Sequence, residues 1–411
     1  MSNSIAQDLR AAINILDPER PLDTPERLAN YYVSRPLSPL EELKMLLEDT
    51  DDPQKVLFTG HRGSGKTTEL AKLVQELDDS FMVMHYSVKS ILNLFDLSYV
   101  DVVLSLGLEL FKRATAENIP VNQVLLESIL DFTKEITRDV ETGVKDQAEV
   151  GVSLNLHVVK LSSKLATEDA TREIVREKVS RRLSDLLENI ELLSREVERH
   201  TGKRLLMVVE DLDKTDLDTA TNLFYKHANS LLAPPVSVIY TFPIAMRHHN
   251  DFMQIEMNFP NLYILPNLKV RDRAGKPSEE GVDCLRRILT CRVTEGLFRD
   301  GALEALAALS GGIPRELIVL ARQASLEARG AGLESLEVAE IERAAQRKRT
   351  DYQLLLTSEQ LRLLQLVQRH KRVENDTEHR ALLHNLSALE YRNSGVWYDV
   401  HPLVEALLED E

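Results

Sequence analysis

The sequence predicts an α/β protein, with a parallel sheet that carries a helical insertion and is followed by a helical lid and a small C-terminal domain. Three observations predict this class. A glycine-rich loop joins an apolar strand to a helix-forming run over residues 56–70, and apolar strands alternate with helical patterns up to about residue 270. Beyond that point, apolar residues recur at three- and four-residue steps, until two helical patterns and a hairpin pattern close the chain.

The glycine-rich loop is the most informative stretch, because residues 60–67 read GHRGSGKT and match the G-x-x-x-x-G-K-[ST] motif. Glycines let successive backbone N–H groups wrap a phosphate at the start of a helix, where the dipole also favours an anion. Lys66 is placed to reach the β- and γ-phosphates, and the Thr67 hydroxyl to bind Mg²⁺. The motif predicts a nucleotide-binding P-loop whose site residues are Gly60, Arg62, Gly63, Ser64, Gly65, Lys66, Thr67 and Thr68.

Composition narrows the class of protein further. The chain has 411 residues, 43% of them hydrophobic, which is enough for two or three cores. Its net charge of −16 argues against broad attraction to nucleic acid or acidic membranes. Cys284 and Cys291 are too few for a disulfide framework or a zinc site. No apolar run has membrane-spanning length and no leader pattern opens the chain, so we expect a cytoplasmic protein that does not contact membranes.

The N-terminal segment, residues 1–53, predicts two short helices around a proline-rich stretch. The first runs from Ile5 to about Ile15, and the second follows Ser38, which is a suitable residue to begin a helix before Pro39. Tyr32, Val33 and Arg35 lie between them. Two interpretations of these three residues stay open: they fold over a nucleotide base, or they pack and cover the surface.

The core, predicted over residues 54–270, is interrupted between about residues 115 and 203, a length that requires structure of its own. The apolar spacing predicts a helix from Val121 to Val140 and a long helix from about Glu168 to Glu198, and strict alternation over 150–158 predicts a half-buried strand. The long helix is either an arm for a partner or a helix that packs on the core, and common helical packing favours the second interpretation.

Beyond the insertion, an apolar strand ends in the acidic residues Glu210, Asp211 and Asp213. Ligands bind at the carboxyl ends of strands in open α/β sheets, where a P-loop protein needs carboxylates for Mg²⁺ and for the attacking water. We therefore expect a Mg²⁺ site formed by Thr67, Glu210 and Asp211. Thr241, near the end of the next strand, is placed to sense the γ-phosphate, while the loop at 247–249 is expected to be solvated.

Residues 271–350 predict a lid of four helices, with Gly312-Ile313-Pro314-Arg315 placing an arginine at the start of one of them. Arg315 either reaches the phosphates or pairs with Glu316 or another neighbour. Residues 351–411 predict two helices and a hairpin, the order of a winged helix. This segment has 6 Lys and Arg against 11 Asp and Glu, and its net charge of −5 disfavours DNA binding.

At this level the motifs resemble those of AAA+-related P-loop ATPases, in particular STAND switches and the origin-recognition-complex-like branch. The resemblance covers about residues 30–411 and depends most on residues 60–67, 205–213 and 312–315. It implies a five-stranded parallel sheet, a helical lid and a C-terminal winged helix. Two departures are Glu210, where the family has aspartate, and Asp211, where AAA+ ATPases have the catalytic glutamate. The changed reach of both acids implies slow turnover.

The resemblance also implies roles for single residues. Pro314 is similar to the proline of the G-x-P motif with which STAND lids contact nucleotide, and Arg315 to the sensor-2 arginine. Thr241 resembles sensor 1, and Arg35 resembles the arginine that precedes the first strand. The implied catalytic set is Lys66, Glu210, Asp211, Thr241 and Arg315.

These inferences lead to one main hypothesis, an ATP-binding and ATP-hydrolysing conformational switch with ATP or ADP and Mg²⁺ as cofactors. We expect a protein partner or effector and a nucleotide-dependent homo-oligomer, in bacterial stress or phage-defence signalling. Two alternatives remain: a DNA-associated loader or initiator, identified by salt-sensitive DNA binding, and a nucleotide-bound adaptor without hydrolysis.

Overall fold

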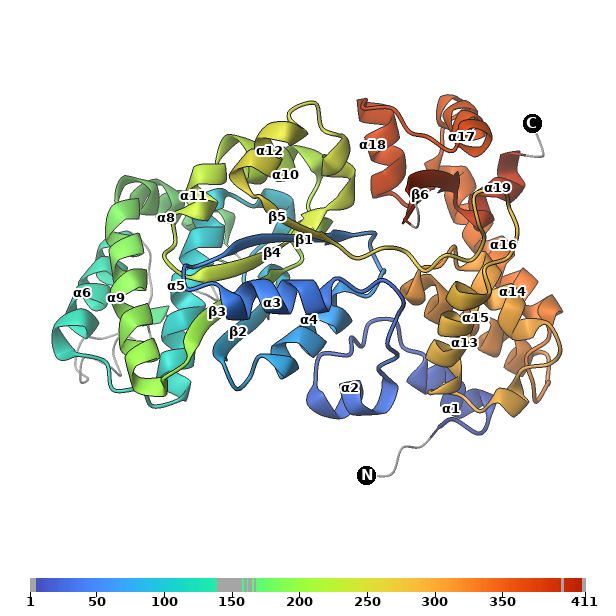
Figure 1. Cartoon of the computed structure of the whole chain (residues 1–411), viewed down its shortest axis with the longest axis horizontal. Helices are drawn as coiled ribbons and strands as arrows, with labels where there is room; N and C mark the ends of the chain where they lie inside the picture. The colour runs from blue at the N-terminus through green and yellow to red at the C-terminus, as the bar shows by residue number, and fades with distance from the viewer. Residues whose placement is uncertain are drawn as a thin grey trace.

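The computed structural model describes residues 5–138, 157–158, 161, 165, 168–392 and 395–408. Its centre is a five-stranded parallel sheet with the strand order β2-β3-β4-β1-β5, which confirms the predicted α/β class (Figure 1). The strands are β1 (Lys55–Gly60), β2 (Phe81–Ser87), β3 (Arg204–Glu210), β4 (Ser237–Pro243) and β5 (Asn261–Ile264). Strand β1 lies between β4 and β5, so the loop that follows it begins at an inner strand of the sheet and not at an edge strand.

Helices cover both faces of the sheet, as the apolar strands require. The alternation within β1 shows this: Leu57 belongs to one large core cluster, whereas Val56 and Phe58 belong to another on the opposite face. The second face is covered by α3 (Leu40–Asp49) and α4 (Lys66–Glu76), and the first by α5 (Tyr99–Ala116) together with α9 (Leu183–Thr201). Ser38 does not cap α3 as predicted, because its hydroxyl donates to Glu69 Oε2 over 2.7 Å and Pro39 occupies the cap position.

The described helices of the insertion lie at one end of the molecule (Figure 1). It contains α6 (Gln123–Ile136), α8 (Asp169–Arg181) and α9 (Leu183–Thr201). The single long helix predicted from Glu168 is wrong, because Arg182 leaves helical geometry (φ −123°, ψ 31°) and its side chain lies over the Phe132 ring. The break lets both halves bury their apolar stripes in the core cluster, so the packing interpretation is confirmed.

The strand predicted over 150–158 falls largely outside the described residues, and His157 and Val158 at its end are helical. Shorter elements lie in the connections between the strands of the sheet. They are the 3₁₀ turns η1 (Val88–Ser90), η2 (Leu94–Asp96), η3 (Leu212–Lys214) and η5 (Ile244–His248), the π-turn η4 (Asn222–Lys226), and the helices α10 (Leu217–Thr221), α11 (Ala228–Leu232) and α12 (Phe252–Asn258).

The second body, at the right of Figure 1, contains the four lid helices predicted after residue 270. They are α13 (Glu279–Thr290), α14 (Ala302–Leu309), α15 (Pro314–Gly330) and α16 (Val338–Leu355), with the 3₁₀ turn η6 (Glu295–Leu297). The N-terminal helix α1 (Leu9–Ile15) packs against α15 although some 300 residues separate them. The proline-rich stretch contains a helix that the sequence analysis missed, α2 (Pro25–Tyr31), which begins at Thr24 with a proline in its first position.

The chain ends in what we call the C-terminal module, residues 357–408. It contains α17 (Ser358–His370), α18 (Thr377–His384), the antiparallel hairpin of β6 (Ala388–Arg392) and β7 (Val396–Val400), and α19 (Pro402–Leu408). Two helices and a hairpin were predicted here, whereas α19 was not. The solvated loop predicted at 247–249 is wrong for Arg247 and His248, because Arg247 pairs with Glu390 and His248 contacts Asn375 and Tyr398 of the module.

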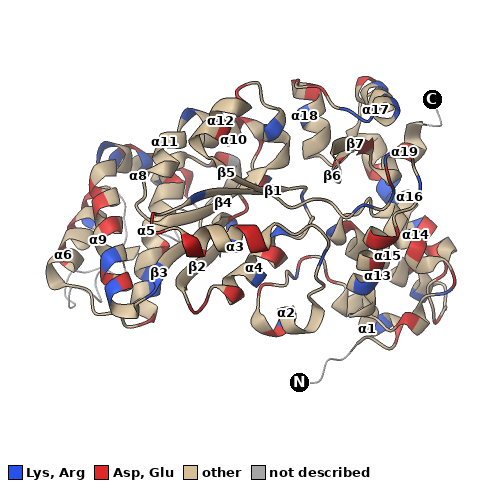
Figure 2. Cartoon of the chain, in the orientation of Figure 1, with Lys and Arg blue, Asp and Glu red and all other residues tan. Residues whose placement is uncertain are grey.

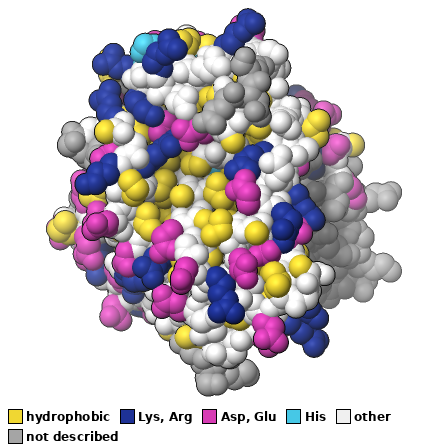
Figure 3. Space-filling view, turned by 90° about the vertical axis from the view of Figure 1, so that its right-hand side faces the viewer, with side chains coloured by type: hydrophobic (Ala, Val, Ile, Leu, Met, Phe, Trp, Pro, Cys, Tyr) yellow, Lys and Arg dark blue, Asp and Glu magenta, His cyan; other side chains and the backbone are white. Residues whose placement is uncertain are grey.

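Acidic and basic residues are interspersed along the chain, and both occur on α17 and α18 (Figure 2). Seen from the right of Figure 1, hydrophobic side chains gather at the centre of the face and charged residues surround them (Figure 3). In this half of the chain Leu354, Leu355 and Leu366 are exposed around the end of α16 and on α17. Within the described part of the chain, no helix is both long and apolar enough to span a membrane.

Candidate nucleotide site

The P-loop leads from the carboxyl end of β1 to the first turn of α4, as predicted. Gly63 and Gly65 adopt left-handed backbone conformations (φ 78° and 101°), which glycine adopts without strain. A Cβ on Gly63 would also lie 2.8 Å from Arg315 Cβ and 3.0 Å from Ile313 Cγ2. The loop is therefore packed closely against the segment that leads into α15, so two distant parts of the sequence form one wall of the site.

Lys66 is buried at the floor of the site. Its Nζ donates to the carbonyls of Gly60 (2.9 Å) and His61 (3.0 Å) and pairs with Asp213 Oδ2 at 2.8 Å. Burial by itself would raise the pKa of Asp213, but the adjacent Lys66 ammonium holds that pKa below its ordinary value. The sequence analysis noted Asp213 after the strand but did not predict it as a site residue. Its position three residues after Glu210 did not indicate that its side chain would contact Lys66.

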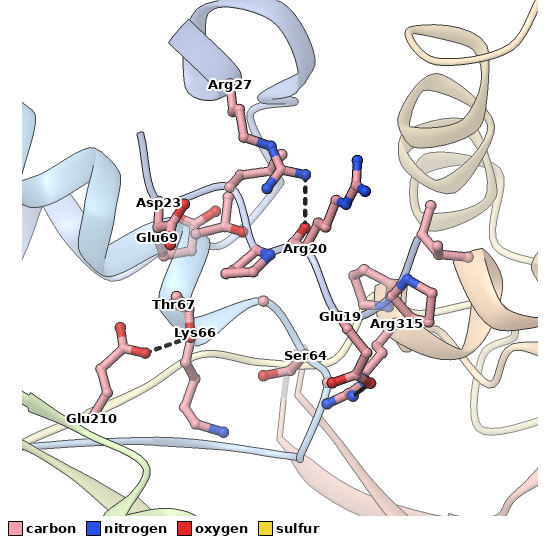
Figure 4. Close-up of a pocket in the computed structure, with 18 of the residues that line it drawn as sticks. Glu19, Arg20, Asp23, Arg27, Ser64, Lys66, Thr67, Glu69, Glu210 and Arg315 are labelled. Atoms are coloured by element: carbon pink, nitrogen blue, oxygen red, sulfur yellow. Dashed lines mark hydrogen bonds and ion pairs between the residues drawn. The ribbon is translucent and has the colours of Figure 1, made fainter. Parts of the chain in front are cut away.

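The predicted magnesium ligands are adjacent. Thr67 Oγ1 donates to Glu210 Oε2 over 2.6 Å, shown as a dashed line in Figure 4, and the other oxygen of Glu210 lies 2.7 Å from His85 Nε2. Asp211 accepts from the Ser87 hydroxyl and pairs with Lys214. Strand β2 thus supplies one partner to each acid, and neither His85 nor Ser87 was predicted because parallel pairing with β3 alone brings them there.

Thr241 is buried at the end of β4 and lines the cavity, where it was predicted to sense a phosphate. Its hydroxyl accepts from the Leu212 N–H at 3.1 Å and donates to the Val209 carbonyl at 3.4 Å. The side chain therefore fixes the turn that carries Asp211, which itself adopts a left-handed conformation (φ 71°).

The two predicted loop arginines have different surroundings. Arg35 donates to the carbonyls of Ser64 and Pro266, and burial lowers the pKa of its guanidinium. It supports the P-loop from the side of the N-terminal segment and also lines the cavity. Arg62 is not among the cavity-lining residues, because its guanidinium donates to the Lys214 carbonyl (2.9 Å) and lies 2.8 Å from His384 Nε2.

The cavity at the P-loop has a volume of about 500 Å³ and is bounded by both bodies of the protein. Pro314 and Arg315 line it from the lid, and Val33 and Arg35 from the N-terminal segment, whereas Tyr32 packs with Leu22 and Leu28 instead. The segment from Asp17 to Asp23 crosses the opening and was not predicted as part of the site. In Figure 4 its Glu19 carboxylate lies against the Arg315 guanidinium, so the ion pair of Arg315 is with Glu19 and not with Glu316, which was one of the alternatives left open.

Three features bear on which groups this cavity fits. Ser64 Oγ is buried without a hydrogen-bond partner and belongs to the cavity lining. The lining also combines cationic Lys66, Arg292 and Arg315 with the carboxylates of Glu210 and Asp211. Among the described residues, no cluster of three or more His, Cys, Asp and Glu side chains has the arrangement of a metal site. This donor set fits a cation that takes most of its ligands from phosphate and water, as Mg²⁺ does.

No protein-family model matches the chain, and no curated protein matches it. Solved structures resemble it over nearly their whole length. They include Cdc6p from Pyrobaculum aerophilum (13% identity, TM-score 0.44, 99% of both chains) and the ORC2 protein of Aeropyrum pernix in ADPNP–ADP complexes (13%, 0.44, 99% of this chain and 97% of that one). Another is the Aeropyrum pernix ORC1 protein in complex with DNA (14%, 0.43, 100% and 98%). At such identities and TM-scores the similarity assigns neither a family nor an activity, so the function must be argued from the site.

Proposed function

We propose that this protein binds ATP or ADP with Mg²⁺ between the sheet and the helical lid, and that it hydrolyses ATP to drive a conformational switch. One observation carries the proposal: the P-loop, the acids at the end of β3 and Arg315 of the lid line a single cavity of about 500 Å³. Backbone N–H groups, a lysine, a hydroxyl and two carboxylates are the kinds of group that bind a triphosphate with Mg²⁺, and their presence around one cavity supports the proposal.

Different residues would bind the phosphates and the Mg²⁺ ion. The P-loop amides and Lys66 would hold the β- and γ-phosphates, and the unpartnered Ser64 hydroxyl would find an acceptor there. Thr67 and Glu210, already 2.6 Å apart, would hold Mg²⁺, with Asp211 nearby. The ion would supply positive charge against the charge that develops on the phosphates.

Asp211 would orient the water that attacks the γ-phosphate, and its bond to Ser87 and its ion pair with Lys214 fix its direction. Thr241 would act through the turn that carries Asp211. The motifs resemble those of AAA+ ATPases, which have glutamate at the position of Asp211. The Asp211 side chain is shorter by one methylene, which supports slow turnover.

The switch depends on Arg315, which belongs to the lid while the P-loop belongs to the sheet. A terminal phosphate would attract Arg315 and a diphosphate would attract it less, so ATP and ADP would hold the two bodies together with different free energies. Arg315 now pairs with Glu19, which is mostly exposed, so a buried phosphate is the stronger partner.

We also propose the domain division 1–53, 54–270, 271–350 and 351–411, and a protein partner for the C-terminal winged-helix-like part. The net charge of −5 in residues 351–411 and the exposed Leu354, Leu355 and Leu366 support a protein contact over DNA. Nucleotide-dependent self-association and a role in bacterial stress or phage defence stay predictions.

The test is to identify any nucleotide that copurifies and to time ATP turnover with and without Mg²⁺ in the wild type, Lys66→Ala and Asp211→Asn. The proposal expects Mg²⁺-dependent turnover that both variants lose, with nucleotide binding lost only in Lys66→Ala. Nucleotide binding without turnover above the Asp211→Asn level would favour the adaptor instead. Salt-sensitive DNA binding that ATP strengthens would favour the loader.

A further inference from the structure

The P-loop is in direct contact with the C-terminal hairpin, over 320 residues away in sequence. His61 Nε2 accepts a hydrogen bond from the backbone N–H of Glu390 in β6, over 2.7 Å. His61 is 1% exposed and Glu390 is 2% exposed, so water does not compete for this bond. A P-loop residue that faces away from the phosphate cavity is therefore tied to the C-terminal module.

Three further contacts surround this bond. Arg62 Nη2 lies 2.8 Å from His384 Nε2 on α18, and both carboxylate oxygens of Glu390 accept from Arg247 Nη1 at 2.8 Å. The hairpin residues Leu389, Tyr391 and Trp397 form a small core cluster with Ile313. The module thus contacts the P-loop on one side and the segment that carries Arg315 on the other.

The hydrogen bond specifies the protonation state of His61. Nε2 can accept from Glu390 only when the ring is neutral. Burial, followed by the nearby Lys66 ammonium, lowers the pKa of His61 to about 4, although the carboxylate of Glu390 opposes that shift. The ring is therefore neutral near pH 7, and the bond is made under those conditions.

Residue 61 also determines the position of a phosphate-binding group. The His61 carbonyl accepts from Lys66 Nζ at 3.0 Å, while the ring of the same residue holds the hairpin. On the other wall, Ile313 packs against both the hairpin cluster and Gly63, and the Arg315 N–H donates to the Gly63 carbonyl at 3.2 Å. Movement of the hairpin would therefore displace residues on both walls of the P-loop.

We infer that His61 is a positioning residue that couples phosphate binding at the P-loop to docking of the C-terminal hairpin, so that each stabilises the other. The inference rests on the proposed function, because it requires nucleotide at this site. By linkage this coupling is reciprocal: a docked hairpin raises nucleotide affinity, and nucleotide strengthens docking by the same factor. Loss of nucleotide would then favour release of the module.

Release would uncover specific surfaces. Helix α18 packs against η5, so the side of α18 that faces η5 is covered in the docked state. Leu389, Tyr391 and Trp397 would lose their contact with Ile313.

The chain provides its own probe of docking, because Trp397 is its single tryptophan and lies in the hairpin, stacked on Tyr391 with 4.7 Å between ring centroids. The experiment titrates MgADP, which is not consumed, and follows Trp397 emission together with hydrogen exchange of the hairpin amides. Binding itself is measured separately by equilibrium dialysis of radiolabelled ADP. Wild type, His61→Ala, His61→Gln and Lys66→Ala are compared, with His200→Ala as a control at an exposed histidine on α9.

We expect MgADP to slow exchange of the hairpin amides in the wild type. His61→Ala should bind MgADP about fivefold more weakly or worse, and bound nucleotide should no longer protect the hairpin. His61→Gln, which keeps an acceptor near the Nε2 position, should restore most of the coupling. His200→Ala should behave as wild type.

The possible failures are distinguishable. If dialysis shows no MgADP bound to the wild type, the proposed function fails and the coupling with it. If the wild type binds MgADP while Trp397 emission and hairpin exchange do not change, the coupling is wrong and the nucleotide site stands. A misfolded His61→Ala variant would also bind MgADP weakly, so His61→Gln provides the second test. If His61→Gln loses as much MgADP affinity and hairpin protection as His61→Ala, His61 acts only through packing and the inference is overturned.

Discussion

Lys66 Nζ and Asp213 Oδ2 lie 2.8 Å apart, and their side chains are only 7% and 4% exposed. A buried lysine charge is costly unless an opposite charge compensates it, and the two loop carbonyls that Lys66 also contacts carry no full charge. Asp213 therefore supplies the counter-charge of the P-loop lysine and helps to fix its position.

The first prediction concerns this pair. Asp213→Asn should cost roughly 3 kcal/mol of stability, because it leaves the Lys66 charge buried without a counter-charge. Denaturant unfolding followed by circular dichroism measures the loss, with the exposed Asp218→Asn as control. Restored stability in the double variant Lys66→Met with Asp213→Asn would support the explanation, whereas equal effects of the two aspartate variants would contradict it.

The second prediction concerns Glu210. Glu210→Gln should raise the Mg²⁺ concentration needed for half-maximal turnover by roughly tenfold or more, because one negative ligand beside the Thr67 hydroxyl is lost. His85→Ala, which removes the partner of the other carboxylate oxygen, should give a smaller rise. A Mg²⁺ titration of ATP turnover compares the variants, and an unchanged midpoint in Glu210→Gln would remove Glu210 from the ligand set.

The third prediction concerns the ion pair between Glu19 and Arg315. Glu19→Gln should release Arg315 for the terminal phosphate and increase the preference for ATP over ADP, whereas Arg315→Ala should abolish that preference. Competition binding with both nucleotides gives the ratio of affinities. If Arg315→Ala keeps the wild-type ratio, Arg315 does not sense the phosphate and only pairs with the N-terminal segment.

The fourth prediction separates backbone strain from steric contact at the P-loop. Gly63 and Gly202 have similar positive φ values (78° and 69°), but an added Cβ meets Arg315 and Ile313 at Gly63 and nothing within 4 Å at Gly202. Gly202→Ala should cost about 1 kcal/mol through strain alone. Gly63→Ala should cost more and also weaken nucleotide binding, and equal unfolding midpoints of the two variants would contradict the packing described here.

The fifth prediction concerns pH. Burial, with smaller contributions from Lys348, His61 and Arg271, lowers the pKa of His401 to about 3, and burial followed by Arg62 lowers that of His384 to about 4, although Asp213 and Asp216 oppose the latter. His61, with Glu390 and Lys66 beside it, has a pKa of about 4. These three histidines are therefore neutral near pH 7 in the docked state.

The sign follows from linkage. In the unfolded chain these histidines have ordinary pKa values near 6.5 and take up protons below about that pH. The free energy of unfolding therefore has its full value above about pH 6.5 and falls as the pH drops toward 4, by roughly 2 kcal/mol per fully buried histidine at pH 5. Asp213 has a lowered pKa and loses its contribution only below about pH 4. Thermal unfolding between pH 7.5 and 5 measures the trend, and His401→Gln should flatten it. A flat wild-type profile in this range would contradict the prediction.

Much of the fold was predictable because its signals are local. The apolar strands, the glycine-rich loop and the acidic end of β3 each depend on residues close in sequence, and parallel strands place their carboxyl ends at one edge. The predicted meeting of Thr67 with Glu210 followed from this rule. The helix break at Arg182 was missed because it accompanies a contact with the distant Phe132 ring. The helix α2 was missed because its start depends on a single capping residue, Thr24.

The sequence by itself thus determined the fold class and the candidate phosphate-binding residues, since these depend on spacing along the chain and on residue chemistry. Only the tertiary structure decided which distant groups complete the site: Asp213 at Lys66, Glu19 at Arg315, and Glu390 at His61. No local pattern encodes these pairs, because each depends on how the lid and the C-terminal module pack against the sheet. That packing is set by the summed burial of many apolar side chains, and it turns an ordinary loop histidine into the link between the P-loop and the C-terminal module.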